Sequence, residues 1–184
     1  MTAVIHDADR WLDPWLALVA ARAAGRPILE LGCGSGRDTE TLTGVGHVVA
    51  LDLSPDQVAA ARLRAPSAEV HCRDVRDPFP ASSAQARVVV ASLSLHYFGR
   101  HETVALLDRI HELLTPGGLL LCRLNSTNDL HYGAVGYPEI EPHYYLVDGR
   151  PKRFFDRADV DALMAGGWQV LSLQEQTIQR YVRA

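Results

Sequence analysis

Glycine and carboxylate residues stand where two predicted strands end, and their types suit one kind of ligand. Gly32, Gly34 and Gly36 follow the first apolar run, and Asp52 ends the next one, 16 residues after Gly36. A glycine turn lets the backbone approach a ligand closely and directs the free amides of a helix start toward it. A carboxylate at the neighbouring strand end can accept hydrogen bonds from both hydroxyls of a ribose. Together, these features predict a nucleoside site.

The spacing of the glycines separates two classes of nucleotide cofactor. The nicotinamide fingerprint G-x-G-x-x-G/A needs a small residue at its last position, so that the helix can pack closely on the strand. Arg37 occupies that position here, and the pattern is instead G-x-G-x-G preceded by Glu30. A nicotinamide-dependent oxidoreductase is therefore the less favoured alternative.

Short apolar runs alternate with helical stretches along the chain, which predicts an α/β fold with a parallel sheet covered by helices on both faces. Strands are predicted at 27–31, 47–53, 68–73, 87–93, 119–124, 168–173 and 178–182. Helices are predicted at 9–24, 37–42, 54–64, 102–114 and 156–165. The segment 125–150, which follows the predicted strand 119–124, has no sustained period and is typical of a functional loop. Residues 143–147 and 153–155 could pair there as a hairpin.

Length and composition limit the class of protein. The 184 residues, 47% of them hydrophobic, predict one domain over 1–184, with an N-terminal helix in 1–25 and a substrate-side loop or hairpin at 125–155. A formal charge of −4 without a run of Lys or Arg disfavours a nucleic-acid partner. The longest charge-free run, 162–174, is too short to cross a bilayer, and no secretory signal is apparent. Three dispersed cysteines form no disulfide framework, so we expect a cytoplasmic protein.

With these features, the chain resembles the class I S-adenosylmethionine-dependent methyltransferases. Five segments carry the resemblance in order: Glu30 to Gly36, Asp52 to Ser54, the Asp74 region, Ser92 to Tyr97, and Leu114 to Gly118. The resemblance implies S-adenosylmethionine as cofactor and a doubly wound, Rossmann-like sheet of seven mostly parallel strands, the last one antiparallel. The segment ending in Arg153-Phe154-Phe155 is also similar to small bacterial methyltransferases related to tellurite-resistance enzymes.

The same resemblance implies a role for each matching residue. The three glycines would lie against the methionine part of the cofactor, and Glu30 would organise the turn and the methionine amino group. Asp52 would hold the ribose. The remaining positions implied to bind the cofactor are Leu53 beside the adenine, Asp74 and the amide of Val75 at the adenine edge, and Ser92 near the amino group.

Methyl transfer asks the protein mainly to align a nucleophile with the donor and to exclude water. His96 follows the fourth strand and is the most plausible base if a proton must leave; it could equally cap or pack the next helix. Tyr97 and Asn125 are the candidate acceptor-binding residues. The histidine spacing completes no recognisable metal-ligand set, so we expect no metal.

The favoured function is methyl transfer from S-adenosylmethionine to a small-molecule acceptor by in-line displacement. A non-catalytic module that binds S-adenosylmethionine is the main alternative. Cys33 could be a reactive thiol at a helix start, but a small core residue between two glycines is the preferred interpretation. Trp11 and Trp15, one helical turn apart, could close over the cofactor or form an ordinary core stripe.

Overall fold

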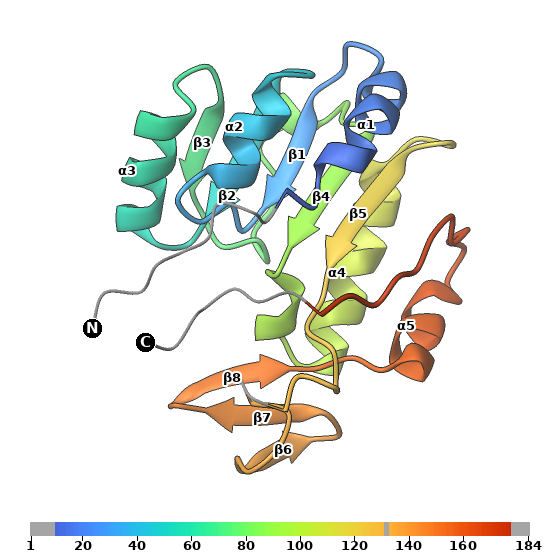
Figure 1. The fold of residues 1–184 in the computed structure, drawn as a ribbon. Helices are drawn as coiled ribbons and strands as arrows, with labels where there is room; N and C mark the ends of the chain where they lie inside the picture. Colours follow the sequence, from blue (N-terminus) through green and yellow to red (C-terminus); the bar gives the residue numbers. More distant parts are fainter. Residues whose placement is uncertain (1–9, 131–132, 178–184) are drawn as a thin grey trace.

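The computed structural model describes residues 10–130 and 133–177, which form a parallel sheet with flanking helices and a smaller sheet at one end (Figure 1). The strands of the large sheet are β1 (Ile28–Leu31), β2 (Val48–Asp52), β3 (Glu69–Cys72), β4 (Val88–Ser92) and β5 (Leu119–Arg123). Their helices are η1 (Asp13–Trp15), α1 (Leu16–Ala23), α2 (Arg37–Thr43), α3 (Pro55–Arg64), η2 (Ala81–Ser83), η3 (Leu95–Tyr97), α4 (Arg100–Leu113) and α5 (Arg157–Met164). The five observed strands differ from the predicted ones by at most one residue at either end.

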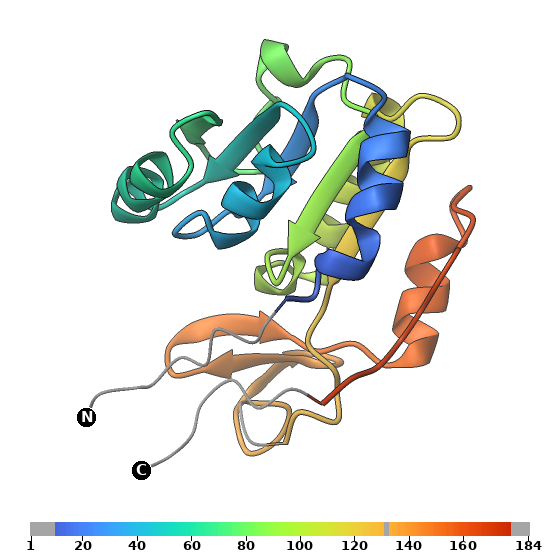
Figure 2. The same ribbon diagram turned by 45° about the horizontal axis from the view of Figure 1, so that its top comes forward.

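Helices cover both faces of the large sheet because its strands are apolar on both sides. Successive side chains of a strand point to opposite faces. Ile28 accordingly packs in the cluster that includes residues of α1, α2 and α3, whereas Leu29 and Leu31 pack in the cluster built on α4. Figure 2 shows α1 and α4 on opposite sides of the sheet. The predicted two-faced architecture is confirmed.

The strand order creates a crevice at one point of the sheet. The order is β3-β2-β1-β4-β5, and all four pairings are parallel. The direction of winding therefore reverses between β1 and β4, and ligands of such sheets bind at the carboxyl ends of the strands beside this reversal. The glycine turn (residues 32–36) follows β1, and Ser92 ends β4, so both lie at this point.

The small sheet consists of β6 (Glu139–Glu141), β7 (Tyr144–Val147) and β8 (Arg150–Arg153), which are antiparallel. It lies beyond the carboxyl ends of the large sheet (Figure 1). The predicted hairpin forms with a tighter turn, because Asp148 and Gly149 both adopt positive φ, 49° and 77°. Two such residues match the right-handed twist of a hairpin. Pro151 is compatible with β8 because β8 is an edge strand.

Two predicted elements differ from the structure. The N-terminal helix begins at Leu16 after a 3₁₀ turn that contains Pro14, and residues 1–9 lie outside the described residues. Residues 168–173 form no strand, and the last predicted strand, 178–182, also lies outside the described residues. A strand needs a neighbour for its backbone hydrogen bonds, and none pairs with 168–173 in the part described. Among the described residues, the large sheet has five strands, and β5 is an edge strand.

Among the described helices, none combines the length and the hydropathy needed to cross a bilayer.

Candidate functional site

The glycine turn and Asp52 are in direct contact. The amide of Gly34 donates to Oδ2 of Asp52 at 2.8 Å, and the amide of Ser54 donates to Oδ1 at 2.9 Å. The contact is possible because β1 and β2 pair in parallel, so that both strands end at the same edge. Each carboxylate oxygen can accept a further hydrogen bond. The structure thus brings together the two features that the sequence analysis assigned to one nucleoside site.

The three glycines of the turn have different surroundings. A Cβ on Gly32 would lie 2.5 Å from Cβ of Ser94, and one on Gly36 would lie 2.7 Å from Cα of Ala61 in α3. A Cβ on Gly34 would meet only Oε1 of Gln57, at 3.8 Å. Gly32 and Gly36 therefore allow the protein to pack on itself, whereas Gly34 faces open space. Contact of Gly32 and Gly36 with a cofactor remains a prediction.

Glu30 lies behind the turn with only 2% of its surface exposed. Burial raises the pKa of Glu30 to about 8; a hydrogen bond from Thr39 of α2, 2.6 Å long, opposes this shift, and Asp38 and Asp52 add to it. The side chain is accordingly mostly uncharged near neutral pH. Through its hydrogen bond with Thr39, Glu30 links β1 to α2, the two elements on either side of the glycine turn.

The residues assigned to the adenine lie at the carboxyl ends of β2 and β3. Leu53 is 65% exposed, an apolar side chain left open beside Asp52. Asp74 is already paired with Arg76, Oδ2 to Nη2 at 2.7 Å, and these hydrogen bonds hold the pKa of Asp74 below its usual value. Val75 is buried. Leu53 is thus available to a ligand, while the carboxylate of Asp74 has a protein partner.

The chain turns sharply after β4. Ser92 ends the strand, and Leu93 has φ of +52°, a left-handed conformation that is uncommon for a residue with a large side chain. Such strain is often stored at functional sites. The next residue, Ser94, is buried against Gly32, and its hydroxyl has no hydrogen-bond partner in the structure. Sequence analysis missed Ser94, since its position two residues after the strand was the only signal.

His96 and Tyr97 follow in η3 and differ in exposure. His96 is 5% exposed and Tyr97 51%, and their ring centroids are 4.1 Å apart. Burial, with a contribution from the charge of Lys152, lowers the pKa of His96 to about 3. The imidazole is therefore neutral, and its buried Nδ1 has no partner.

Asn125 is the second residue after β5. Its backbone oxygen accepts from the amide of Phe155 at 2.8 Å, while its buried Nδ2 has no partner. Ser94, His96 and Asn125 line the same cavity as the glycine turn. Buried polar groups are normally paired, so three unpartnered ones beside one cavity indicate a place for a polar ligand or water. We call Ser94, His96, Tyr97 and Asn125 the acceptor mouth, after the prediction that Tyr97 and Asn125 bind the acceptor.

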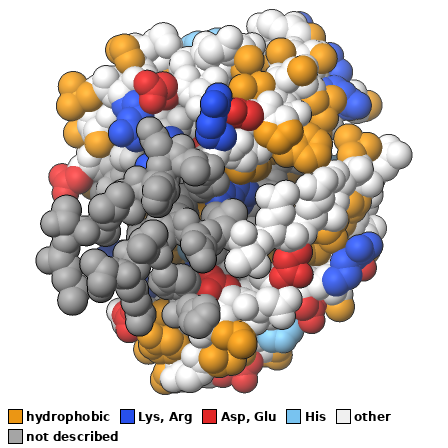
Figure 3. All heavy atoms as spheres, viewed as in Figure 1, with side chains coloured by type: hydrophobic (Ala, Val, Ile, Leu, Met, Phe, Trp, Pro, Cys, Tyr) orange, Lys and Arg blue, Asp and Glu red, His pale blue; other side chains and the backbone are white. Residues whose placement is uncertain are grey.

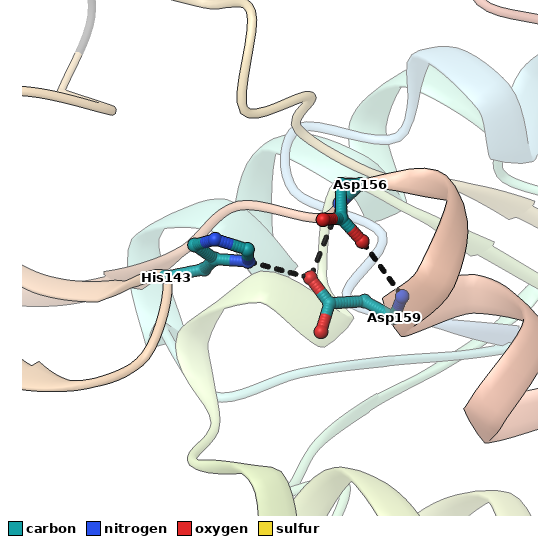
Figure 4. Close-up of side chains that lie close together, drawn as sticks. All are labelled: His143, Asp156 and Asp159. Atoms are coloured by element: carbon teal, nitrogen blue, oxygen red, sulfur yellow. Dashed lines mark hydrogen bonds and ion pairs between the residues drawn. The ribbon is translucent and has the colours of Figure 1, made fainter.

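A second cluster of polar side chains joins the small sheet to α5 (Figure 4). Nδ1 of His143 is 2.7 Å from Oδ2 of Asp159, and Asp156 and Asp159 accept hydrogen bonds from each other's backbone amides. The contact with Asp159 raises the pKa of His143. Although the three side chains could surround an ion, their oxygens already cap α5 and pair with His143. We therefore interpret the cluster as a helix cap with an ion pair.

Burial decides between the alternatives for Cys33. Its side chain belongs to the core cluster, and burial raises the pKa of the thiol above its ordinary value. A thiol kept protonated in this way is a poor nucleophile. Trp11 and Trp15 both line the cavity and pack against the core, and Nε1 of Trp11 also donates to Asp38 at 2.9 Å.

Known proteins resemble the chain in this region. Residues 28–118 match a family model described as a methyltransferase domain. The chain contains a class I S-adenosylmethionine-dependent methyltransferase domain. It is 33% identical over 106 residues to trans-aconitate 2-methyltransferase of Delftia acidovorans, a match that covers 55% of this chain but only 39% of the relative. The chain thus spans about two fifths of the length of that relative.

Solved structures support the fold of the methyltransferase domain. The PH0226 protein of Pyrococcus horikoshii superposes with a TM-score of 0.72 at 18% identity, covering 95% of this chain and 89% of that one. The 1,6-didemethyltoxoflavin-N1-methyltransferase of Burkholderia thailandensis, solved with S-adenosylhomocysteine, gives 0.61 at 22% identity, covering 85% and 66%. At these identities the likeness shows the fold alone. The narrower resemblance to tellurite-resistance enzymes remains a prediction.

Replacing Gly34 and Gly36 by alanine should separate ligand binding from folding. Gly34→Ala places a methyl group in open space with φ of +52°, so we expect about 1–2 kcal/mol of strain but at least a tenfold loss of S-adenosylhomocysteine affinity by calorimetry. Gly36→Ala also has a positive φ, and it forces a methyl group against α3. Overpacking should therefore cost about 1–3 kcal/mol of stability beyond the backbone strain. Unaltered binding by Gly34→Ala would contradict the proposed close approach.

Glu30 should make stability depend on pH. The native state keeps a proton up to a pKa of about 8 that the unfolded state releases near 4.5. Wild-type protein should therefore lose up to about 1.4 kcal/mol of unfolding free energy per pH unit between these values as pH rises. Glu30→Gln keeps an acceptor for Thr39 but carries no such proton, so its slope should be smaller. Urea unfolding at several pH values measures both slopes, and equal slopes would refute the assignment.

Proposed function

We propose that the protein transfers a methyl group from S-adenosylmethionine to a small-molecule acceptor. The observation that carries this proposal is the contact between Gly34 and Asp52, with Gly34 facing open space at the point where the sheet reverses. The residues present fit the cofactor, since a Cβ at Gly34 would fill the space and Leu53 offers an open apolar side chain. Structural neighbours that were solved with S-adenosylhomocysteine support the same cofactor.

The chain's own residues would divide the work of binding. Asp52 would accept the ribose hydroxyls, Leu53 would pack on the adenine, and the amide of Val75 would meet its edge. Ser92 and the newly identified Ser94 would lie near the methionine part, above Glu30. The bound cofactor supplies an activated methyl group on a sulfonium, so the protein needs mainly to orient the acceptor and exclude water.

We propose that His96 contacts the acceptor as a neutral imidazole. Its unpartnered Nδ1 can form a hydrogen bond with the acceptor, but a pKa of about 3 makes it a weak base. Acceptors that arrive already ionised, such as carboxylates, need no proton removed. The relative named trans-aconitate 2-methyltransferase, whose substrate is a carboxylate by name, supports this class. Tyr97 and Asn125 would bind the rest of the acceptor.

The remaining features fit a small-molecule enzyme. On the face drawn in Figure 3, Lys and Arg side chains of the described residues are interspersed with acidic ones, which supports an acceptor other than nucleic acid. Cys33, Cys72 and Cys122 are free thiols, which supports a cytoplasmic location.

We also propose that residues 168–182 complete a seven-stranded sheet with an antiparallel last strand, so that 1–184 is one domain. Residues 167–177 and β5 line the same open space, and Val170, Leu171 and Leu173 are 46%, 54% and 42% exposed. In Figure 3, hydrophobic side chains gather on the side where α1 and β5 lie in Figure 1. A strand placed between β5 and 168–173 would cover this apolar surface.

Turnover with a panel of acceptors tests the proposed function. Wild-type protein with S-adenosylmethionine should release S-adenosylhomocysteine with at least one small acceptor, carboxylates first among them. Asp52→Asn should weaken cofactor binding by about 1.5–3 kcal/mol, because a hydrogen-bonded charged group is lost. Asp56→Asn, on the exposed start of α3, is the matched control. Binding without turnover across the panel would favour the non-catalytic module.

Hydrogen exchange of the full chain tests the sheet. We expect the amides of 168–173 to exchange at least tenfold more slowly than in an unstructured peptide, because ladder hydrogen bonds would protect them. Exchange at the unstructured rate would show that these residues stay unpaired.

A further inference from the structure

The last residue of β8 carries a guanidinium that is almost completely enclosed. Arg153 is 4% exposed, and a buried cation is tolerated only when its donors are paired. Nε donates to the carbonyl of Phe98 at 3.2 Å, Nη1 donates to the carbonyl of Pro142 at 3.2 Å, and Nη2 pairs with the carboxylate of Glu141. The side chain of Arg153 therefore joins β8 and residues 141–142 to the end of η3, the 3₁₀ turn that contains His96.

Two further side chains of the small sheet bond to the same stretch. The hydroxyl of Tyr144 donates to the carbonyl of Tyr97 at 2.9 Å, and Oε1 of Glu141 accepts from the amide of Arg100 at 2.6 Å. The guanidinium of Arg153 also lies 4.8 Å from the centre of the Tyr144 ring. Three closely spaced attachment points, at residues 97, 98 and 100, are thus held by the small sheet.

The turn depends on these contacts because its own hydrogen bonds are long. The amide of Tyr97 is 3.5 Å from the carbonyl of Ser94, and the amide of Phe98 is 3.5 Å from that of Leu95. Both distances exceed the usual range for N–H to O bonds. From α4, Thr103 adds a hydroxyl to the Phe98 carbonyl at 3.4 Å. Thr103 also bonds to the carbonyl of Gly99, through its amide at 2.9 Å and its hydroxyl at 3.0 Å, so the short side-chain bonds to residues 97, 98 and 100 are those from the small sheet.

We propose that Glu141, Tyr144 and Arg153 form a clamp that positions His96 and Tyr97 for the acceptor. The three are positioning residues, since they reach the acceptor mouth only through the backbone of the turn. The hydrogen bonds and the ion pair of the clamp described above reach none of the residues assigned to the cofactor. It follows that the small sheet sets acceptor geometry, while the glycine turn and Asp52 set cofactor affinity. This inference rests on the proposed function only where it says that the turn is positioned for an acceptor. The attachment of the turn to the small sheet does not depend on that function.

Tyr144→Phe and Tyr145→Phe form a matched pair for the test. Each removes one hydroxyl from β7, but only that of Tyr144 bonds to the turn; that of Tyr145 bonds to Glu139. Residue-resolved amide exchange should speed up at least threefold at residues 97–100 in Tyr144→Phe and stay unchanged there in Tyr145→Phe. Affinity for S-adenosylhomocysteine should stay within threefold of wild type in both variants.

Arginine variants test the centre of the clamp. Arg153→Ala should speed amide exchange at residues 97–100 at least tenfold. Arg153→Lys keeps the positive charge but loses the planar guanidinium, so its exchange rate there should lie between those of Arg153→Ala and wild type. Arg157→Ala, which removes an exposed ion pair with Asp161, is the control. With an identified acceptor, the clamp variants should raise its KM or lower kcat without changing cofactor affinity.

Each outcome decides one claim. Unchanged exchange at 97–100 in both Tyr144→Phe and Arg153→Ala overturns the clamp, as does equal acceleration in the two controls. If Arg153→Ala does not fold, Tyr144→Phe and Arg153→Lys decide the question. If the protein binds no S-adenosylhomocysteine, the proposed function fails, while the exchange comparison still tests whether the small sheet holds the turn.

Discussion

The carboxylate of Asp52 is the point on which the arrangement of the site depends. It accepts amides from the turn after β1 and from the chain after β2, and so fixes two strand ends to each other. The carbonyl of Leu51 reinforces the contact by accepting from the amides of Gly32 and Cys33 at 2.8 and 2.9 Å. Parallel pairing is what places these groups together, because it brings every strand end to one edge of the sheet.

Burial decides which groups near the site carry charge. Glu30 and His96 are enclosed, and the loss of hydration favours the uncharged form of each. The carboxylates left closer to solvent are those of Asp52 and Asp74, at the ends of β2 and β3. This distribution suits a ligand whose sulfonium is positive and whose nucleoside needs acceptors for its hydroxyls. The neutral imidazole in turn limits the acid-base chemistry available to an acceptor.

The two proposed halves of the site, one for the cofactor and one for the acceptor, are supported by different kinds of structure. The cofactor half stands on strand ends held by the core, where the side chains of β1 and β4 are fully or almost fully buried up to Leu31 and Ala91. The acceptor half stands on a single 3₁₀ turn with long internal hydrogen bonds and on a sheet of three short strands. Methyltransferases could in this way share a cofactor site and differ in acceptor, since changes in the small sheet need not disturb the glycine turn.

The sequence by itself determined the layered sheet and the meeting of the glycine turn with Asp52. Apolar periodicity and the spacing of Gly34 and Asp52 are local signals, and the strands and the contact were found where the pattern placed them. Only the tertiary structure decided the properties of His96 and the roles of Ser94 and Arg153. A pKa depends on burial, an unpartnered hydroxyl depends on what packs around it, and Arg153 meets Phe98 across 55 residues of chain. Such properties arise from contacts between distant segments, which no local pattern of residues specifies.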